Sequence, residues 1–184
     1  MAGNTKGLGF VNVRRFVVAR TGDADGWARA LERLAYADRD VAASALASGW
    51  YSLDVYARLI RAVADEIGGG LKVIHDLGRF EAEQDLTVVH RVFLRMLHPA
   101  TMPEKTAEYW SRFHDTGTWV VTRKESGYQA SLSDWGLVDD ALCAELTSYL
   151  TRVVELGGAK DVRVRHVECR NRGARACTFD GTWK

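Results

Sequence analysis

Apolar residues recur every three or four positions through most of the first half of the chain, which is the period of an α-helix. The predicted helices span about residues 7–20, 25–36, 53–67, 71–98 (one bent helix or two) and 104–113. Ser52 can cap the third helix, and the three glycines after it can end it. In the first range a strand stays possible, because Phe16, Val17 and Val18 are consecutive. The clearest break is the segment 98–103, which carries both prolines.

After Gly117 apolar and polar residues alternate, which is the period of a β-strand. Residues 118–123 and 128–132 form a predicted hairpin, residues 137–156 a long helix, and residues 160–168 and 175–182 a second hairpin. The pattern therefore predicts an α+β fold. In it an N-terminal helical half (about 7–113) packs on a four-stranded antiparallel sheet of ββαββ order (about 117–183). At 184 residues the chain suits one domain better than two, so we expect a single domain over residues 1–184.

Charge is balanced, with 25 Lys and Arg against 24 Asp and Glu, so no net field attracts the molecule to nucleic acid or anionic membranes. The basic segment 160–175 lacks interleaved aromatic residues and contains Asp161 and Glu168, which argues against a nucleic-acid partner. The start of the chain lacks the apolar run of a signal peptide, and no stretch has transmembrane length, so no membrane partner is expected. With an odd number of cysteines as well, the sequence favours a cytoplasmic protein.

All three cysteines lie in the last quarter of the chain, and a histidine stands three positions before the second. Three thiolates and an imidazole are the ligand set of a closed, tetrahedral, structural zinc site. Cys143 falls on or beside the apolar arc of the predicted long helix. His166 and Cys169 end one predicted strand and Cys177 begins the next, so a hairpin crossed by the helix can bring all four side chains together. Glu168 is the substitute ligand if His166 faces away; the alternative to a metal site is three free cysteines in the core.

The segment 166–179, with Trp183 beyond it, resembles the C-terminal signature of 4-vinyl reductase domains, which are small-molecule-binding modules and sensors. In that family a helix cysteine, an acid three residues before the next cysteine, and two cysteines eight residues apart bind zinc. Cys143, Cys169 and Cys177 match the cysteine positions, including the 26-residue interval between the first two. His166 replaces the usual acid and exchanges one zinc ligand for another. The resemblance therefore implies a structural zinc ion on these four residues.

The N-terminal half is similar to the wider superfamily that contains haem–nitric-oxide-binding domains and the transport-particle subunits of Golgi traffic. Residues 6–12 and Trp27 are similar to the opening of the haem-binding members, and residues 78–80 to a glycine-led turn there. Those members hold the haem propionates with a tyrosine, a serine and an arginine at alternate positions. The nearest stretch here, residues 128–132, lacks the arginine, so the resemblance makes haem doubtful. The chain also resembles a set of uncharacterised myxobacterial proteins of this size.

Aromatic residues are more numerous than a minimal core needs, which favours an apolar pocket for an aromatic or hydrocarbon ligand between the helices and the sheet. His98, Trp110, Trp119 and Tyr128 are the predicted pocket residues; alternatively, the aromatic rings fill the core or a dimer interface. No nucleophile motif, phosphate loop or paired-carboxylate spacing supports catalysis, so we do not expect an enzyme.

Together these observations predict a non-catalytic small-molecule-binding or regulatory module with a structural Cys3His zinc site and an apolar pocket. We expect it to form a homodimer through its helical half. The alternative is a scaffold or adaptor that binds a protein partner, as the transport-particle subunits do. A haem-based gas sensor is the less favoured third interpretation.

Overall fold

The computed structural model describes residues 3–23, 25–85, 101–125 and 127–184. Its helices are α1 (Gly7–Thr21), α2 (Asp25–Glu32), α3 (Tyr36–Ser44), α4 (Leu53–Ile67), α5 (Leu71–Asp85), α7 (Met102–Tyr109) and α8 (Asp140–Leu156), with the short 3-10 helices η2 (Trp110–Arg112) and η3 (Arg170–Arg172). Its strands are β1 (Asn4–Lys6), β2 (Trp50–Ser52), β3 (Thr118–Lys124), β4 (Gly127–Ser133), β5 (Arg163–Glu168) and β6 (Cys177–Thr182).

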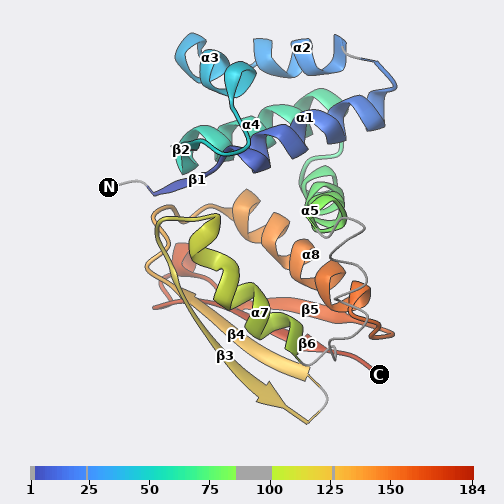
Figure 1. The fold of residues 1–184 in the computed structure, drawn as a ribbon, viewed down its shortest axis with the longest axis vertical. Helices are drawn as coiled ribbons and strands as arrows, with labels where there is room; N and C mark the ends of the chain where they lie inside the picture. The colour runs from blue at the N-terminus through green and yellow to red at the C-terminus, as the bar shows by residue number, and fades with distance from the viewer. Residues whose placement is uncertain (1–2, 24, 86–100, 126) are drawn as a thin grey trace.

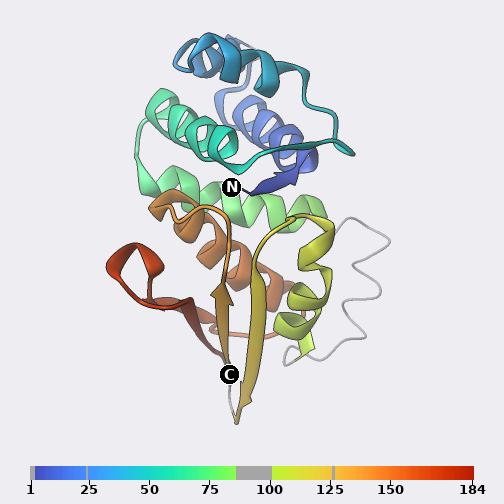
Figure 2. The same cartoon turned by 90° about the vertical axis from the view of Figure 1, so that its left-hand side faces the viewer.

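Helix α5 lies between two layers of the molecule (Figure 1). On one side are α1 to α4 with the two-stranded ladder of β1 and β2, and on the other are α7, α8 and the four-stranded sheet. The view turned by 90° shows α5 running across the molecule between these layers (Figure 2). Helix α5 packs against α8, and it also contacts α1 and α4. It therefore joins the helical half to the sheet half.

The last four strands form one antiparallel sheet in the order β3-β4-β6-β5. Helix α8 contacts β5 and β6, and α7 contacts β3, so these two helices cover one face of the sheet. The register between β5 and β6 shifts between His166 and Glu168. Such a bulge re-aims the side chains beside it, here at the end of the strand that carries two predicted metal ligands.

Side chains at the helix ends explain where the two long helices near the cavity begin. The Ser52 hydroxyl accepts a hydrogen bond from the backbone at the start of α4. The Asp139 carboxylate accepts two from the first turn of α8. A cap of this kind stabilises a helix by about 1 kcal/mol. Gly68 ends α4 with a φ of 76°, a conformation that side chains with a Cβ disfavour.

The two halves share one hydrophobic core. A continuous cluster of buried side chains runs from α1 through α4, α5 and α8 to β4 and β6. Its most buried members include Phe10, Val13, Leu53, Leu59, Ile60, Leu77, Leu132, Leu142, Leu150 and Phe179. Burial of one such side chain contributes about 1.5–3 kcal/mol, so this cluster is the main force that holds the halves together.

The predicted α+β class is confirmed, with a helical N-terminal half and a four-stranded antiparallel sheet. The predicted helix over residues 25–36 is wrong in its extent, because it ends at Glu32 and a separate helix begins at Tyr36. The Arg39 guanidinium donates to the carbonyl oxygens of Leu31 and Glu32 at the end of α2 and of Leu34 just beyond it, which satisfies acceptors that the end of the helix leaves open. The ladder of β1 and β2 was not predicted, because strands of three residues are too short to show a period.

Of the predicted helix over residues 71–98, the structure describes α5, which ends at Asp85. The rest of that helix and the break at Pro99 lie outside the described residues. Residues 78–80 do not form a glycine-led turn, because Gly78 lies inside α5 where this helix meets α8. A Cβ on Gly78 would lie 2.2 Å from the carbonyl oxygen of Glu145, so the close helix contact requires glycine. In the described part of the chain no helix is long and apolar enough to cross a membrane.

Candidate functional site

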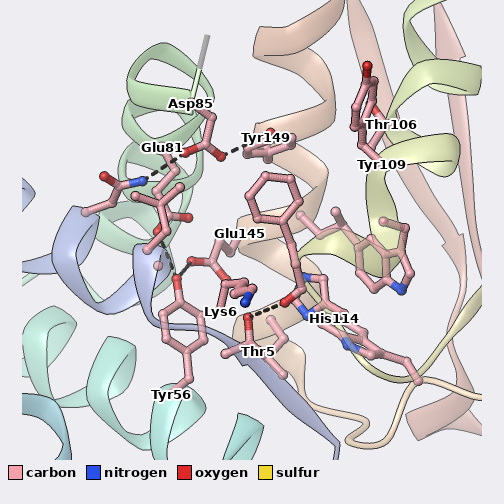
Figure 3. Close-up of a pocket in the computed structure, with 18 residues that line it drawn as sticks. Thr5, Lys6, Tyr56, Glu81, Asp85, Thr106, Tyr109, His114, Glu145 and Tyr149 are labelled. Carbon is pink, nitrogen blue, oxygen red and sulfur yellow. Dashed lines mark hydrogen bonds between the residues drawn. The ribbon is translucent and has the colours of Figure 1, made fainter. Parts of the chain in front are cut away.

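A cavity of about 130 Å³ lies between the two halves of the molecule (Figure 3). Residues of β1, α1 and α4 line it from the helical half, α5 lines it from the middle, and α7, η2 and α8 line it from the sheet half. One side, which we call the acidic wall, consists of Asn12, Tyr56, Glu81, Asp85 and Glu145. The other side, the aromatic wall, consists of Trp110, Phe113, His114 and Trp135. The cavity is therefore polar on one side and apolar on the other.

At the centre of the acidic wall, one hydroxyl stands between two carboxyl groups. The Tyr56 oxygen lies 2.9 Å from Glu81 Oε1 and 2.5 Å from Glu145 Oε1, and all three side chains are buried. A phenol has one proton and can donate to only one carboxylate, so the other carboxyl group must itself be protonated and donate to the phenol oxygen. Burial, together with the neighbouring Glu145, raises the pKa of Glu81 well above its usual range. Burial raises the pKa of Glu145 to about 7.

Asp85 forms the second part of the acidic wall. Its carboxylate accepts a hydrogen bond of 3.0 Å from the Asn12 side-chain amide and one of 3.2 Å from the Tyr149 hydroxyl. Burial raises the pKa of Asp85 to about 6, although these two donors act in the opposite direction. Asn12 is 1% exposed, and its side-chain oxygen has no hydrogen-bond partner among the described residues. The wall thus presents an unused acceptor beside a buried carboxylate.

The aromatic wall holds a neutral histidine. The His114 ring stacks on Trp110 at 4.0 Å between centroids and meets Trp135 edge-on at 5.5 Å. Burial lowers the pKa of His114 to about 3, so the imidazole carries no charge at neutral pH. Its Nδ1 atom is buried and has no partner among the described residues. Figure 3 shows His114 across the cavity from Tyr56 and Glu81.

Two of the four predicted pocket residues lie elsewhere, and one is on the wall. Trp110 lines the cavity, and its Nε1 donates to the carbonyl oxygen of Thr116 at 2.8 Å. Trp119 lies behind it, edge-on to the Trp110 ring at 5.5 Å. Tyr128 is buried in a separate cluster under the sheet. His98 lies outside the described residues.

A second candidate site is the cluster of Cys143, His166, Cys169 and Cys177. Their ligand atoms all lie within 4.8 Å of one another, and the three cysteines are buried. The Cys143 and Cys177 sulfurs are 3.9 Å apart. Zn–S bonds of about 2.3 Å in a tetrahedron place two sulfurs about 3.8 Å apart, so the observed spacing fits one zinc ion.

The surroundings of the cluster favour a cation. Hydrogen bonds from Cys143, from the Arg170 backbone and from His166 lower the pKa of Cys177 to about 5, while that of Cys143 is raised because it is the donor in the pair. The His166 ring stacks on Phe179, and its Nε2 atom is buried without a hydrogen-bond partner in the described chain. Three sulfurs and one imidazole nitrogen thus lie around the same point. This is the chemistry of a soft metal site.

The histidine, and not the alternative acid, completes this cluster. Glu168 lies beyond the bulge in β5, where its carboxylate accepts a hydrogen bond of 2.8 Å from the Thr178 hydroxyl. The four predicted ligands therefore converge in the structure.

Sequence reasoning missed the acidic wall. Glu81 stands four residues after Leu77 on the buried face of α5, and Glu145 stands between the buried Leu142 and Leu146 on α8. Acidic residues are almost never fully buried unless they are paired. A glutamate inside an apolar helical stripe was therefore the signal that could have revealed this wall.

No family model matches the chain, and no curated protein matches it. Solved structures do. An H-NOX protein from S. oneidensis in the Fe(II)NO state is 17% identical over 97% of this chain and 99% of its own, with a TM-score of 0.71. The H-NOX domain from Shewanella oneidensis in the Fe(II)CO state is 17% identical over 97% of this chain and 98% of its own, with a TM-score of 0.72. The unliganded Fe(II) H-NOX protein from K. algicida is 11% identical over 97% of this chain and 96% of its own, with a TM-score of 0.69. At these identities the comparisons establish the fold, which is that of H-NOX proteins.

These comparisons correct two predictions from the sequence. The prediction of a non-haem zinc module with an apolar pocket is wrong, because the similar structures are H-NOX proteins with ferrous iron. For the same reason, haem cannot be set aside as a doubtful cofactor. The fold depends on the hydrophobic pattern of the whole chain, whereas the argument against haem rested on one local triplet. The fold fits the wider superfamily of haem–nitric-oxide-binding domains and does not single out 4-vinyl reductase domains.

Proposed function

We propose that this chain is a ligand-binding sensor domain, in which a ligand in the cavity changes how the helical half packs on the sheet half. The observation that carries this proposal is the hydrogen bond between Tyr56 of α4 and Glu145 of α8, which crosses the cavity wall. An occupant of the cavity touches both partners of this bond. The ligation states of the similar H-NOX proteins support a sensory role as well.

An iron porphyrin is the first ligand to test, because the similar structures hold ferrous iron that binds NO or CO. His114 fits the chemistry of such a group, since a neutral imidazole with a free nitrogen is a common axial ligand. Once bound, the group would supply an iron that takes a diatomic gas. The cavity measures about 130 Å³. Ligand pockets begin at about 300 Å³, so the two halves must separate at the cavity to admit a porphyrin.

Titration of the purified protein with haemin, followed by reduction, tests this ligand. We expect a stoichiometric Soret band in the wild type. His114→Ala should shift or abolish the band. His75→Ala should behave like the wild type, because His75 lies outside the cavity and bonds Ser148 at 2.6 Å. A wild type that binds no haemin refutes the porphyrin. An unchanged spectrum of His114→Ala refutes the assignment of His114 as the axial ligand.

We also propose that Cys143, His166, Cys169 and Cys177 hold one zinc ion, which would join α8 to the last hairpin. The donor set, the sulfur spacing and the unpartnered imidazole nitrogen support this assignment. Elemental analysis of protein purified without chelators should find one zinc per chain. Protein that is folded and free of metal would overturn it.

A sensor of this kind needs no catalytic group, so the absence of enzymatic activity is part of the proposal. Four expectations from the sequence stay predictions. They are a homodimer formed through the helical half, a protein partner that receives the signal, a cytoplasmic location and a specific kinship with 4-vinyl reductase domains. Light scattering during size-exclusion chromatography, with and without haemin, measures the oligomeric state that the proposal expects to be a dimer.

A further inference from the structure

The acidic wall has more hydrogen-bond acceptors than donors. Three carboxyl groups and the Asn12 oxygen share the protons of Tyr56, Tyr149, the Asn12 amide and one protonated carboxyl group. No ion pair within the described chain reaches Glu81, Asp85 or Glu145. Lys6 also lines the cavity, but its ammonium group donates to the carbonyl oxygen of Ser48 and lies over the Trp50 ring. Among the residues that the structure describes, the wall is therefore a buried, partly ionised group of acceptors without a paired cation.

The carboxyl groups are not arranged around a metal ion. In the described part of the chain, the His, Cys, Asp and Glu side chains that converge as metal ligands are those of the Cys3His cluster. The oxygens of the acidic wall instead face a cavity whose other side is aromatic. A ligand that fits both sides has a cationic head with several donors and a small apolar body.

The size of the cavity limits the apolar body to about one ring. The cavity volume is about 130 Å³. An engineered protein cavity of about 150 Å³ is known to accommodate benzene. Trp110 and Trp135 line the cavity, and aromatic rings of this kind attract a cation or another ring. The uncharged His114 does not repel a cation.

We infer that the cavity binds a small primary amine in its ammonium form. The NH₃⁺ group donates to Asp85 and to the free oxygen of the neighbouring Asn12, and the apolar body lies against the aromatic wall. An ammonium group has three donors and no acceptor, which complements a wall that is rich in acceptors. This inference names a ligand class for the proposed sensor cavity. It rests on the cavity part of that proposal and not on the porphyrin.

Calorimetry and thermal melts of the haem-free full chain at pH 7 test the inference, with benzylamine as the probe. Benzyl alcohol is the matched neutral control, because it has the same shape and lacks the charge. We expect benzylamine to bind and to raise the melting temperature, and benzyl alcohol to bind at least ten-fold more weakly. Equal binding of the two, or no binding of benzylamine to folded wild type, would overturn the inference.

Variants of α5 locate the site. Asp85→Asn should weaken the binding of benzylamine at least ten-fold and leave the binding of benzyl alcohol unchanged. Asp76→Asn, on the exposed side of the same helix where Asp76 pairs with Arg20, should bind like the wild type. An Asp85→Asn variant that binds benzylamine as tightly as the wild type would overturn the inference. The comparison of the two probes on wild type stands even if a variant fails to fold.

The same titrations separate this inference from the proposed function. Binding of benzylamine without binding of haemin supports the cavity as a sensor site with an ammonium ligand and refutes the porphyrin. Binding of haemin without benzylamine overturns this inference alone. Failure of both probes refutes the cavity as a ligand site and the inference together.

Discussion

The acidic wall gives the stability of this protein a pH dependence that one substitution should remove. Asp85 is largely buried, and burial raises its pKa from 3.8 to about 6. A carboxyl group whose pKa is higher in the folded state stabilises that state fully below its unfolded pKa. This contribution is lost as the pH rises through the folded value. The difference corresponds to about 3 kcal/mol of unfolding free energy, lost between about pH 4 and pH 7.

Asp85→Asn is the appropriate perturbation, because asparagine keeps the shape of the side chain and cannot ionise. Urea unfolding of wild type and variant between pH 4.5 and pH 7.5 measures the difference in their unfolding free energies. Titrating groups away from the acidic wall cancel, whereas the Asp85 charge also raises the pKa of Glu81 and Glu145, so their response is part of the measured difference. We expect the wild type to lose about 2 kcal/mol relative to the variant over this window. The control is Asp76→Asn, which removes a half-exposed ion pair with Arg20. The difference in unfolding free energy between wild type and this control should change by less than about 1 kcal/mol over the same pH range.

The sign of the pH dependence shows whether the Asp85 carboxyl group is buried without a cation. A difference between wild type and Asp85→Asn that is constant with pH would mean that this carboxyl group is solvated, which contradicts the acidic wall. A wild type that gains stability relative to the variant as the pH rises would mean that the Asp85 anion is paired with a cation inside the protein. Either result would refute the reasoning.

Three further substitutions, the first with a matched control, test other contacts. Tyr56→Phe removes the hydroxyl between two buried carboxyl groups and should lower the unfolding free energy by about 2 kcal/mol. Tyr36→Phe, at an exposed ring, should leave it unchanged in the same urea melts. Cys169→Ala should lose the metal in elemental analysis and lower the melting temperature by roughly 10 °C, and a chelator should bring wild type to the same value. A metal content equal to that of wild type would contradict the ligand assignment. Gly78→Ala should destabilise by about 2–3 kcal/mol in thermal melts, because its Cβ would meet the Glu145 carbonyl oxygen; unchanged stability would contradict the close α5–α8 contact.

The convergence of Cys143, His166, Cys169 and Cys177 could be predicted because these residues follow local periods. Cys169 and Cys177 flank the turn of one hairpin, and the helical phase places Cys143 toward the sheet. The choice between His166 and Glu168 could not be made from the sequence. Both stand at even steps along the strand, so a period of two places them on the same face. The register shift between them in β5 separates them and leaves the imidazole on the cluster.

The cavity could not be predicted in the same way, because its walls come from helices that are far apart in the sequence. Tyr56, Glu81 and Glu145 meet only after α4, α5 and α8 pack, and no local pattern fixes that packing. The aromatic residues were a poor guide for the opposite reason. Tyr128 and Trp119 are placed by the alternation of their strands and fill the space under the sheet, which is the usual fate of a ring on an inward face.

Helix α8 carries one residue of each candidate site at neighbouring positions. Cys143 and Glu145 are two residues apart, so at 100° per residue they point to nearly opposite sides of the helix, one toward the hairpin and one toward α4 and α5. The close contact at Gly78 fixes α8 against α5. A ligand at the acidic wall competes with the Tyr56 hydroxyl for the carboxyl groups of α5 and α8. Under the proposed function, the contact that yields on binding is therefore the one made by α4, and the helical half moves against a fixed pair of α5 and α8.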